Sequence, residues 1–291
     1  MRLRKAYRLE WGRHVLELGR RTCIMGILNV TPDSFSDGGL FLDPAAAVAQ
    51  GERLAAEGAD IIDIGGESTR PFSEPVAAEE EIRRVVPVIA ELAQRVSAPI
   101  SIDTTRGVVA RRALEVGAAM VNDISALRRD PSVAAVAAEF GAPLFLMHMQ
   151  GEPRTMQVAP GYDDLIGEIR DFLQAAAAAA EAQGVPRSML IADPGIGFGK
   201  TSAHNLQLIH HLAELAALDM PILVGPSRKA FIRRLVAKTG ESDIAPDAPM
   251  VAIGTQAAVA AAILNGAHIV RVHDVGNTAA TCKVVDAIVN C

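Results

Sequence analysis

The sequence predicts an α/β protein with a (β/α)8 TIM barrel, and three observations support this fold class. Short segments rich in Ile, Val, Leu and Met recur eight times along the 291 residues, and helical stretches separate them. Near-continuous apolar segments suit strands that are buried on both faces of a parallel sheet. Polar side chains follow each segment, as expected where barrel strands end at one common face. The eight expected strands are residues 23–28, 59–64, 98–102, 118–121, 142–147, 188–192, 220–224 and 267–272.

The segment before the first barrel strand predicts a β-hairpin. Residues 6–19 alternate loosely between apolar and polar, with Leu9 and Trp11 before Gly12 and Val15 after it. Alternation of this kind on both sides of a turn residue is typical of two antiparallel strands. We expect this N-terminal β-hairpin, within residues 1–21, to close the bottom of the barrel.

Helix boundaries are signalled between the strands. Asp43-Pro44 and Asp130-Pro131 each combine an N-cap residue with proline at the first helical position. The run Ala175–Ala180 lies inside a helix expected over 162–183, because alanine is the best helix former. Four glycines stand where a helix should end and a strand begin, as expected of left-handed C-caps: Gly58, Gly117, Gly141 and Gly266.

The chain shows no linker, so residues 1–291 are expected to form a single domain. The alternative to a barrel is an open doubly wound sheet, which normally has a dominant glycine-rich turn after its first strand. The turn at 29–39 contains no G-x-G-x-x-G pattern, which favours the barrel. The segment Gly195–Thr201 resembles a P-loop, but Pro194 stands where that pattern requires glycine.

Composition excludes several function classes. The chain has 28 Lys+Arg against 34 Asp+Glu, a net charge of −6, and only 4% aromatic residues, which argues against a nucleic-acid partner. The longest weakly polar run, 250–264, is too short and too polar to span a membrane. The three cysteines are odd in number and far apart, which favours a reducing compartment over a disulfide framework. We therefore expect a cytoplasmic protein without nucleic-acid or membrane partners.

The polar residues at the strand ends define a candidate site. Asp103, Asn122 and Asp193 follow three different strands and supply acceptors plus one amide, a set that suits a planar heterocycle with several N–H donors. Lys229 and Arg271 add cations after the last two strands. Asp63 lies in the middle of a strand, so we expect it to point into the barrel and support these residues through hydrogen bonds.

A second polar group indicates an anion site. The loops after the seventh and eighth strands are the usual phosphate position in barrels, and His273 precedes a helix N-terminus. Asn29 beside phosphates suits Mg²⁺, which takes few protein ligands and completes its shell with phosphate oxygens and water. The sequence thus predicts an enzyme that binds a polar heterocycle and a phosphate with magnesium. The expected anion-site residues are Asn29, Thr69, Arg70, Arg271 and His273.

Four other features have simpler interpretations. Lys229 could form a Schiff base as in barrel aldolases, but the phosphate and heterocycle pattern explains it better. His148 is as consistent with a structural hydrogen bond as with a ligand role. Glu79–Glu81 is interpreted as an acidic first helical turn that complements the helix dipole. Cys23, on an expected buried strand, is interpreted as a small core residue.

At these residues the sequence closely resembles the dihydropteroate synthases, from about residue 22 to 275. The resemblance rests on several long motifs that follow different strands. They are IMGILNVTPDSFSDGG (24–39), GADIIDIGGESTRP (58–71), ISIDTT (100–105), VNDIS (121–125), LMHMQGEP (146–153), DPGIGFGKT (193–201), GPSRKAFI (225–232) and RVHDV (271–275).

The resemblance implies a transferase that condenses dihydropterin methyl diphosphate with 4-aminobenzoate, releasing pyrophosphate, through dissociative substitution at the pterin methylene. It implies Mg²⁺ as cofactor, sulfonamides as competitors and a homodimer, for which the Ala-rich helices near 255–264 and 277–289 could supply the interface. The implied pterin pocket is Asp103, Asn122, Met147, Asp193, Phe198, Lys229 and Arg271. The implied diphosphate site is Asn29, Thr69, Arg70, Arg271 and His273, with Asn29 as metal ligand. The implied 4-aminobenzoate site is Phe35, Arg70, Pro71 and Ser227, and the implied catalytic set is Asp37, Asp103, Lys229, Arg271 and His273.

Two alternatives and three departures accompany this resemblance. A methyltetrahydrofolate-dependent methyltransferase domain would share the pterin residues but would not need the Thr69-Arg70-Pro71 loop or a diphosphate site. A non-catalytic pterin-binding paralogue would be expected to lose anion-site residues that this chain keeps. Phe72 stands where these synthases commonly have glycine, Met250-Val251 where Glu-Arg is more usual, and Ala230 where a polar residue is common.

Overall fold

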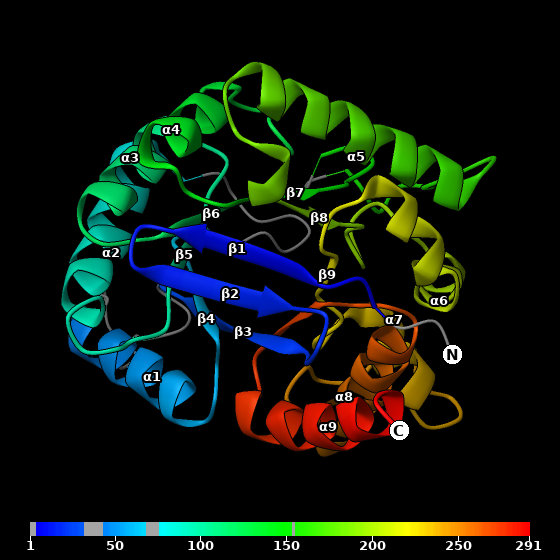
Figure 1. Cartoon of the computed structure of the whole chain (residues 1–291). Coiled ribbons are helices and arrows are strands. Elements are labelled where there is room, and N and C mark those ends of the chain that lie inside the picture. Colours follow the sequence, from blue (N-terminus) through cyan, green and yellow to red (C-terminus); the bar gives the residue numbers. More distant parts are fainter. Residues whose placement is uncertain (1–3, 32–42, 68–75, 153–154) are drawn as a thin grey trace.

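The computed structural model describes residues 4–31, 43–67, 76–152 and 155–291, and these form a barrel of parallel strands with helices around it (Figure 1). The strands follow one another in the order β8-β7-β6-β5-β4-β3-β10-β9. This confirms the predicted fold class, and all eight predicted segments contain the observed strands or overlap them. The strands are β3 Cys23–Asn29, β4 Ile61–Gly65, β5 Ile100–Asp103, β6 Met120–Asp123, β7 Leu144–Met147, β8 Leu190–Asp193, β9 Leu223–Val224 and β10 Ile269–Val272.

The barrel is nearly closed, and its weakest seam lies between β8 and β9. Among the described residues, an isolated bridge between Ala192 on β8 and Ile222, just before β9, is the only ladder pairing between these two segments. β9 is shorter than the predicted segment 220–224. Pro221 precedes this bridge and has no N–H to donate to a neighbouring strand, which limits pairing there.

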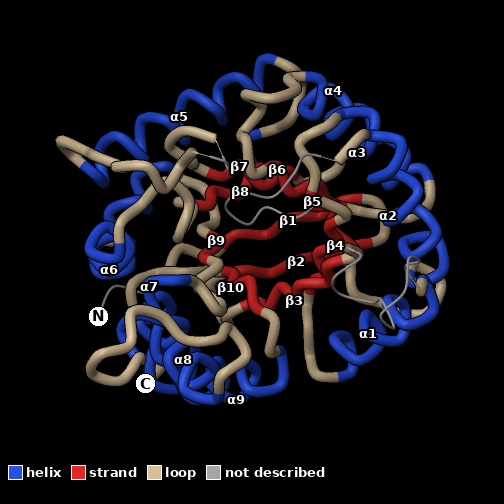
Figure 2. Tube along the Cα trace, turned by 180° about the vertical axis from the view of Figure 1, so that it is seen from behind, coloured by secondary structure: helices blue, strands red, loops and turns tan. Residues whose placement is uncertain are grey.

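The helices form a ring outside the strands (Figure 2). Asp43 caps the first of them, accepting from the Ala45 amide at 2.9 Å, as the Asp43-Pro44 signal predicted. The four predicted C-cap glycines all have positive φ angles, between 63° and 118°. The helices are α1 Pro44–Ala56, α2 Ala78–Leu92, α3 Gly107–Glu115, α4 Ser132–Phe140, α5 Leu165–Ala182, α6 Ser202–His210, α7 Ala230–Val236, α8 Pro249–Leu264 and α9 Val275–Val289.

The N-terminal hairpin lies across the bottom of the barrel, as predicted (Figure 1). Its strands, β1 Tyr7–Trp11 and β2 His14–Leu18, are antiparallel. Leu9 and Leu18 are buried against side chains from inside the barrel, including that of Cys23, which is fully buried as expected of a core residue. The Trp11 indole also donates to the Ala119 carbonyl at 2.9 Å. The hairpin therefore closes the end of the barrel opposite the candidate site.

Among the described residues, no helix combines the length and the hydrophobicity that a membrane span requires. The apolar run at 250–264 forms α8, which packs beside α7 and α9 on the outside of the barrel.

Candidate active site

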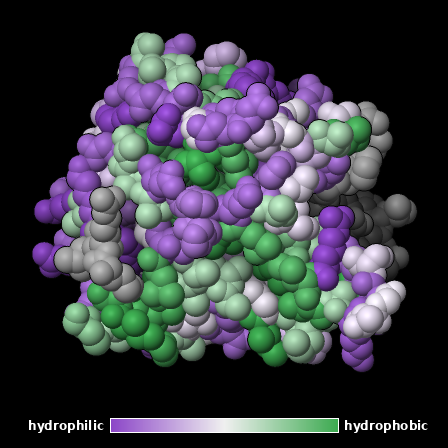
Figure 3. All heavy atoms as spheres, turned by 90° about the vertical axis from the view of Figure 1, so that its right-hand side faces the viewer, coloured by the Kyte–Doolittle hydropathy of each residue, from purple (hydrophilic) through white to green (hydrophobic). Residues whose placement is uncertain are grey.

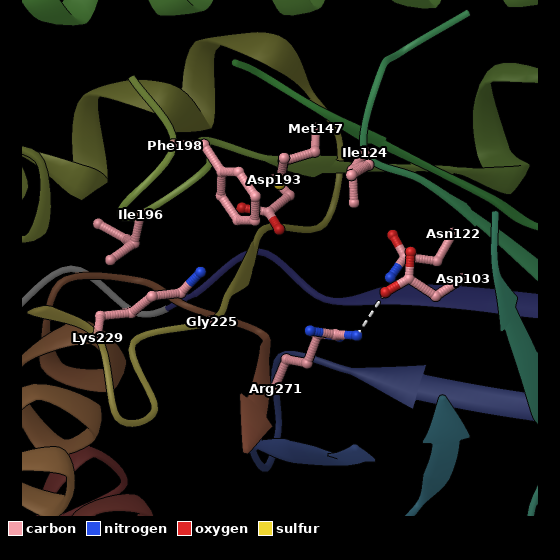
Figure 4. Close-up of a pocket in the computed structure, with 10 residues that line it drawn as sticks. All are labelled: Asp103, Asn122, Ile124, Met147, Asp193, Ile196, Phe198, Gly225, Lys229 and Arg271. Atoms are coloured by element: carbon pink, nitrogen blue, oxygen red, sulfur yellow. Dashed lines mark hydrogen bonds and ion pairs between the residues drawn. The ribbon is translucent and has the colours of Figure 1, made fainter. Parts of the chain in front are cut away.

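A pocket lies at the carboxyl ends of the barrel strands (Figure 4). All seven side chains of the expected pterin pocket line it, although they come from five strands and two loops. Ile124, Ile196 and Gly225 line it as well, and the sequence did not single them out because apolar residues beside a strand end resemble ordinary core. The seven expected residues are Asp103, Asn122, Met147, Asp193, Phe198, Lys229 and Arg271.

Arg271 on β10 is held by two carboxylates. Its Nε donates to Asp63 Oδ2 at 2.6 Å, and its Nη2 donates to Asp103 Oδ2 at 2.7 Å. Burial lowers the pKa of Arg271, but the charges of Asp63 and Asp103 outweigh burial and raise it. Figure 4 shows the guanidinium beside the pocket, joined to Asp103. The arrangement fixes a permanently charged, planar group at the edge of the pocket.

Asp63 is the supporting residue that the sequence predicted. It is fully buried on β4, and the same Oδ2 also accepts from Asn122 Nδ2 at 3.0 Å. A carboxylate only accepts, so the amide nitrogen of Asn122 must face Asp63 and the orientation of the amide is defined. One buried carboxylate thus orients two pocket side chains.

The two acidic pocket residues have raised pKa values. Burial raises the pKa of Asp193 to about 6, although the Gly195 amide donates to its Oδ1 at 2.7 Å and Lys229 and Arg271 lie near. Burial also raises the pKa of Asp103 to about 7, against the opposing effect of Arg271. Both carboxylates therefore change charge near neutral pH, as is common for groups in functional sites.

Lys229 lies opposite these carboxylates at the start of α7. Burial and the charge of Arg271 lower its pKa to about 8, while Asp193 and Asp103 oppose them. Its ammonium nitrogen lies 3.9 Å from the centre of the Phe198 ring. The pocket thus has carboxylates, cations and apolar side chains around one cavity, which suits a flat polar heterocycle.

Only some of the residues expected to bind the anion belong to the described part of the chain. Those that do lie beside this pocket. Ser227 Oγ lies 2.9 Å from His273 Nδ1, just before the N-terminus of α9. Asn29 ends β3, which is the neighbour of β10 in the sheet. The other expected diphosphate, 4-aminobenzoate and catalytic residues lie outside the described residues, as does Phe72: they are Phe35, Asp37, Thr69, Arg70 and Pro71.

Two residues outside the pocket, His148 and Glu81, have interpretations from the sequence that can be compared with their contacts. His148 forms a structural hydrogen bond, one of its two interpretations: its Nδ1 lies 2.9 Å from Lys200 Nζ, and burial and that charge lower its pKa to about 2. Glu79–Glu81 form the acidic first turn of α2, as expected, but Glu81 also has a contact that the sequence did not predict. Glu81 is buried and forms an ion pair with Arg106, which also pairs with Glu67 at 2.6 Å.

The chain matches the family model described as "Pterin binding enzyme" over residues 25–273. A dihydropteroate synthase of Synechocystis is 50% identical over 280 residues, covering 96% of this chain and 94% of the relative. That of Escherichia coli K12 is 45% identical over 264 residues, covering 91% and 90%. The Xanthomonas albilineans dihydropteroate synthase structure with 4-aminobenzoic acid superposes with a TM-score of 0.87, 45% identity and 98% coverage of both chains.

Two further solved structures have the same fold. A Yersinia pestis dihydropteroate synthase in a sulfonamide complex gives a TM-score of 0.88 at 43% identity, covering 97% of this chain and 98% of that one. The fold and the pocket therefore define a pterin-binding barrel enzyme. The Xanthomonas albilineans enzyme in complex with 7,8-dihydropteroate matches with a TM-score of 0.84 at 43% identity, covering 97% and 98%. The chain belongs to the dihydropteroate synthase family.

Proposed function

We propose that this chain condenses (7,8-dihydropterin-6-yl)methyl diphosphate with 4-aminobenzoate, giving 7,8-dihydropteroate and pyrophosphate. The observation that carries the proposal is the pocket itself, which Asp193, Asn122, Lys229 and Arg271 line together with apolar side chains. The shared synthase name of the relatives favours this reaction over the methyltransferase domain and the non-catalytic paralogue.

Each pocket side chain has a part in reading the pterin ring. Asp193 accepts from the pyrimidine N–H and amino group, and Asn122 binds the adjacent edge. Lys229 donates to the ring carbonyl and a ring nitrogen, since an ammonium has three donors and no acceptor. Arg271 lies flat on the pterin face, where a guanidinium stacks well on an aromatic system. Met147 and Phe198 form the apolar walls.

The reaction is a dissociative substitution at the pterin methylene. Arg271 and His273 neutralise the charge that grows on the leaving pyrophosphate. The electron-rich ring delocalises the cation, and the Asp103 carboxylate at the pocket edge stabilises it electrostatically. The aryl amine of 4-aminobenzoate then attacks, and it needs no strong general base because it is already a competent nucleophile. Asp37 joins this catalytic set in the proposal.

Mg²⁺ is part of the proposed reaction, held on the protein side by Asn29. Within the described ranges no three His, Cys, Asp or Glu side chains are grouped to hold a metal. A single amide oxygen at the end of β3 still fits Mg²⁺, because that ion binds through few protein ligands together with substrate phosphates and water. When bound, Mg²⁺ supplies Lewis-acid stabilisation of the pyrophosphate oxygens.

The second substrate is proposed to bind beside Ser227, with Phe35, Arg70 and Pro71 completing its site. Asn29, Thr69, Arg70 and His273 contact the diphosphate in this proposal. Relatives have been solved with 4-aminobenzoic acid and with a sulfonamide. We therefore expect sulfonamides to compete with 4-aminobenzoate in this chain.

The test is pyrophosphate release from purified protein with the pterin diphosphate, with and without 4-aminobenzoate and Mg²⁺. Release that needs both, and that falls when a sulfonamide is added, supports the proposal. Binding of pterin without any pyrophosphate release contradicts it and favours the non-catalytic paralogue or methyl transfer.

A homodimer is proposed from the outer surface of α8. This helix is apolar on most sides, and a helix of that kind is buried on more than one face. Val251 is buried against the barrel, whereas Met250 and Ile253 are 51% and 61% exposed. The area around α7, α8 and α9 is largely hydrophobic (Figure 3). Other exposed apolar side chains on these helices are Leu235, Leu264, Val284 and Ile288.

Sedimentation velocity tests the dimer. The parent chain is expected to sediment as a dimer and the I253D variant as a monomer, because removing a charged aspartate from water at an apolar interface has a large unfavourable free energy. A monomeric parent chain contradicts the proposal.

We place the protein in the cytoplasm, since Cys23, Cys282 and Cys291 are all free thiols.

A further inference from the structure

A buried lysine outside the pocket has no part in the proposed reaction. Lys200 ends the glycine-rich loop 194–200 that joins β8 to α6, the segment that only superficially resembled a P-loop. It is 2% exposed and does not line the pocket. Lysine is almost never fully buried unless its charge is paired. Its burial therefore calls for specific partners.

Lys200 joins the loop to the end of β7. Its Nζ lies 2.9 Å from His148 Nδ1 and donates to the Phe198 carbonyl at 3.0 Å. A protonated lysine has donors only, so Nδ1 accepts and His148 carries its own proton on Nε2. Tyr162 covers the same place, with its ring 5.9 Å from Nζ and its hydroxyl donating to the Gly199 carbonyl at 2.8 Å.

The loop fits its surroundings closely at its three glycines. Gly195, Gly197 and Gly199 all have positive φ angles, of 71°, 84° and 61°. A Cβ on Gly195 would lie 1.9 Å from the His148 carbonyl oxygen, and one on Gly197 would lie 2.9 Å from Lys229 Cδ. The loop is thus pressed between the chain after β7 and a pocket lysine, and a small displacement would change the pocket wall.

We propose that Lys200 is a positioning residue that fixes the Phe198 wall of the pterin pocket against Lys229. Lys200 binds the backbone oxygen of Phe198, whose ring lies against the Lys229 ammonium. His148 provides a fixed anchor because it follows directly after β7. This inference rests on the proposed function, since it assigns the residue a role in binding the pterin substrate.

The charge of Lys200 acts on the same pocket. The titratable groups that face it are His148 after β7, Asp193 at the end of β8, Lys229 before α7 and Tyr162 before α5. Burial lowers the pKa of Lys200 to about 7, with Lys229 acting in the same direction and Asp193 against both. In return, the charge of Lys200 lowers the pKa of Asp193. Loss of that charge therefore leaves Asp193 harder to ionise.

The test compares K200M with K238M, which removes an exposed lysine beyond the end of α7. Steady-state kinetics and calorimetry with the pterin diphosphate are run from pH 5 to 9, and thermal unfolding checks the fold. For K200M we expect a rise of about tenfold in KM for the pterin diphosphate, as for loss of one hydrogen bond to a charged donor. KM for 4-aminobenzoate should stay within about twofold, and the acid limit of pterin binding should move to higher pH.

Three outcomes decide between the explanations. A folded K200M variant with unchanged pterin KM and pH limit overturns the inference, and equal losses for both substrates do the same. If K200M does not fold, K200R replaces it, because arginine keeps the charge and the donors. The parental pH limit in K200R supports the inference, and an upward shift contradicts it. A parent chain that binds no pterin instead refutes the proposed function.

Discussion

Replacing Asp193 by asparagine is expected to stabilise the fold while it removes pterin binding. Asp193 is 6% exposed at the end of β8, where burial raises the pKa of its carboxyl from 3.8 to about 6. Asparagine resembles the protonated carboxyl in shape and can still accept from the Gly195 amide through its own oxygen. D193N therefore removes a charge that the folded state disfavours and keeps the local hydrogen bond.

The size of the effect follows from that pKa. A raised folded-state pKa means that the native protein binds more protons than the unfolded chain between about pH 4 and 6, so stability falls as pH rises through this range. The loss is complete above about pH 6 and amounts to about 3 kcal/mol, at about 1.4 kcal/mol for each pH unit. At pH 5 only about half of it has developed.

Urea unfolding of the parent and D193N at pH 7.5 and pH 5 measures the stability difference at both pH values; loss of the Asp193 charge also lowers the pKa of Lys229 and of Lys200, which act on the difference chiefly at the higher pH. We expect D193N to be more stable by about 3 kcal/mol at pH 7.5 and by about half as much at pH 5. Pterin affinity, followed by calorimetry, should fall at least about 100-fold, since a charge-assisted pair is lost. Equal or lower stability of D193N at pH 7.5, or a difference that does not narrow at pH 5, refutes the reasoning.

Three further predictions concern the same face of the barrel. The kcat/KM for the pterin diphosphate should rise between about pH 6 and 7, where Asp193 and Asp103 ionise, and fall above about pH 8, where Lys229 loses its proton; a flat profile would exclude these assignments. Gly195→Ala should cost at least about 2 kcal/mol in urea unfolding, because of its positive φ and a carbonyl oxygen 1.9 Å from the new Cβ, whereas Gly161→Ala, which meets nothing within 4 Å, should cost little; equal costs would contradict this. Asp63→Asn should raise KM for the pterin diphosphate about tenfold by loosening the guanidinium that it anchors, and an unchanged KM would show that the anchor is dispensable.

The architecture could be predicted because its signals are local. Strand burial on both faces leaves apolar segments, and left-handed glycines such as Gly58 and Gly141 are needed where a helix turns directly into a strand. Asp43 caps its helix through its own side chain, so the helix start is visible in two adjacent residues. The predicted pocket residues converge for the same reason, because parallel strands in a barrel deliver their ends to one face.

What could not be predicted depends on contacts between distant segments. Glu81 has the sequence context of an exposed helical turn, and only its pairing with Arg106 from the next βα unit makes it buried. Lys200 belongs to a glycine-rich loop, and its role depends on a histidine 52 positions earlier. The short β9 reflects Pro221, whose effect is visible only once the neighbouring strand is known.

The weak pairing between β8 and β9 links ligand binding in the pocket to the local stability of the barrel. Asp193 stands on one side of it and Lys229 on the other, while a single backbone bridge joins the two strands. A heterocycle bound by both side chains would connect the two sides of this weak pairing, where few backbone hydrogen bonds connect them. Without a bound heterocycle, the backbone hydrogen bonds of the barrel are expected to open most easily between β8 and β9. Amide hydrogen exchange at residues 222–224 should therefore slow when the heterocycle binds.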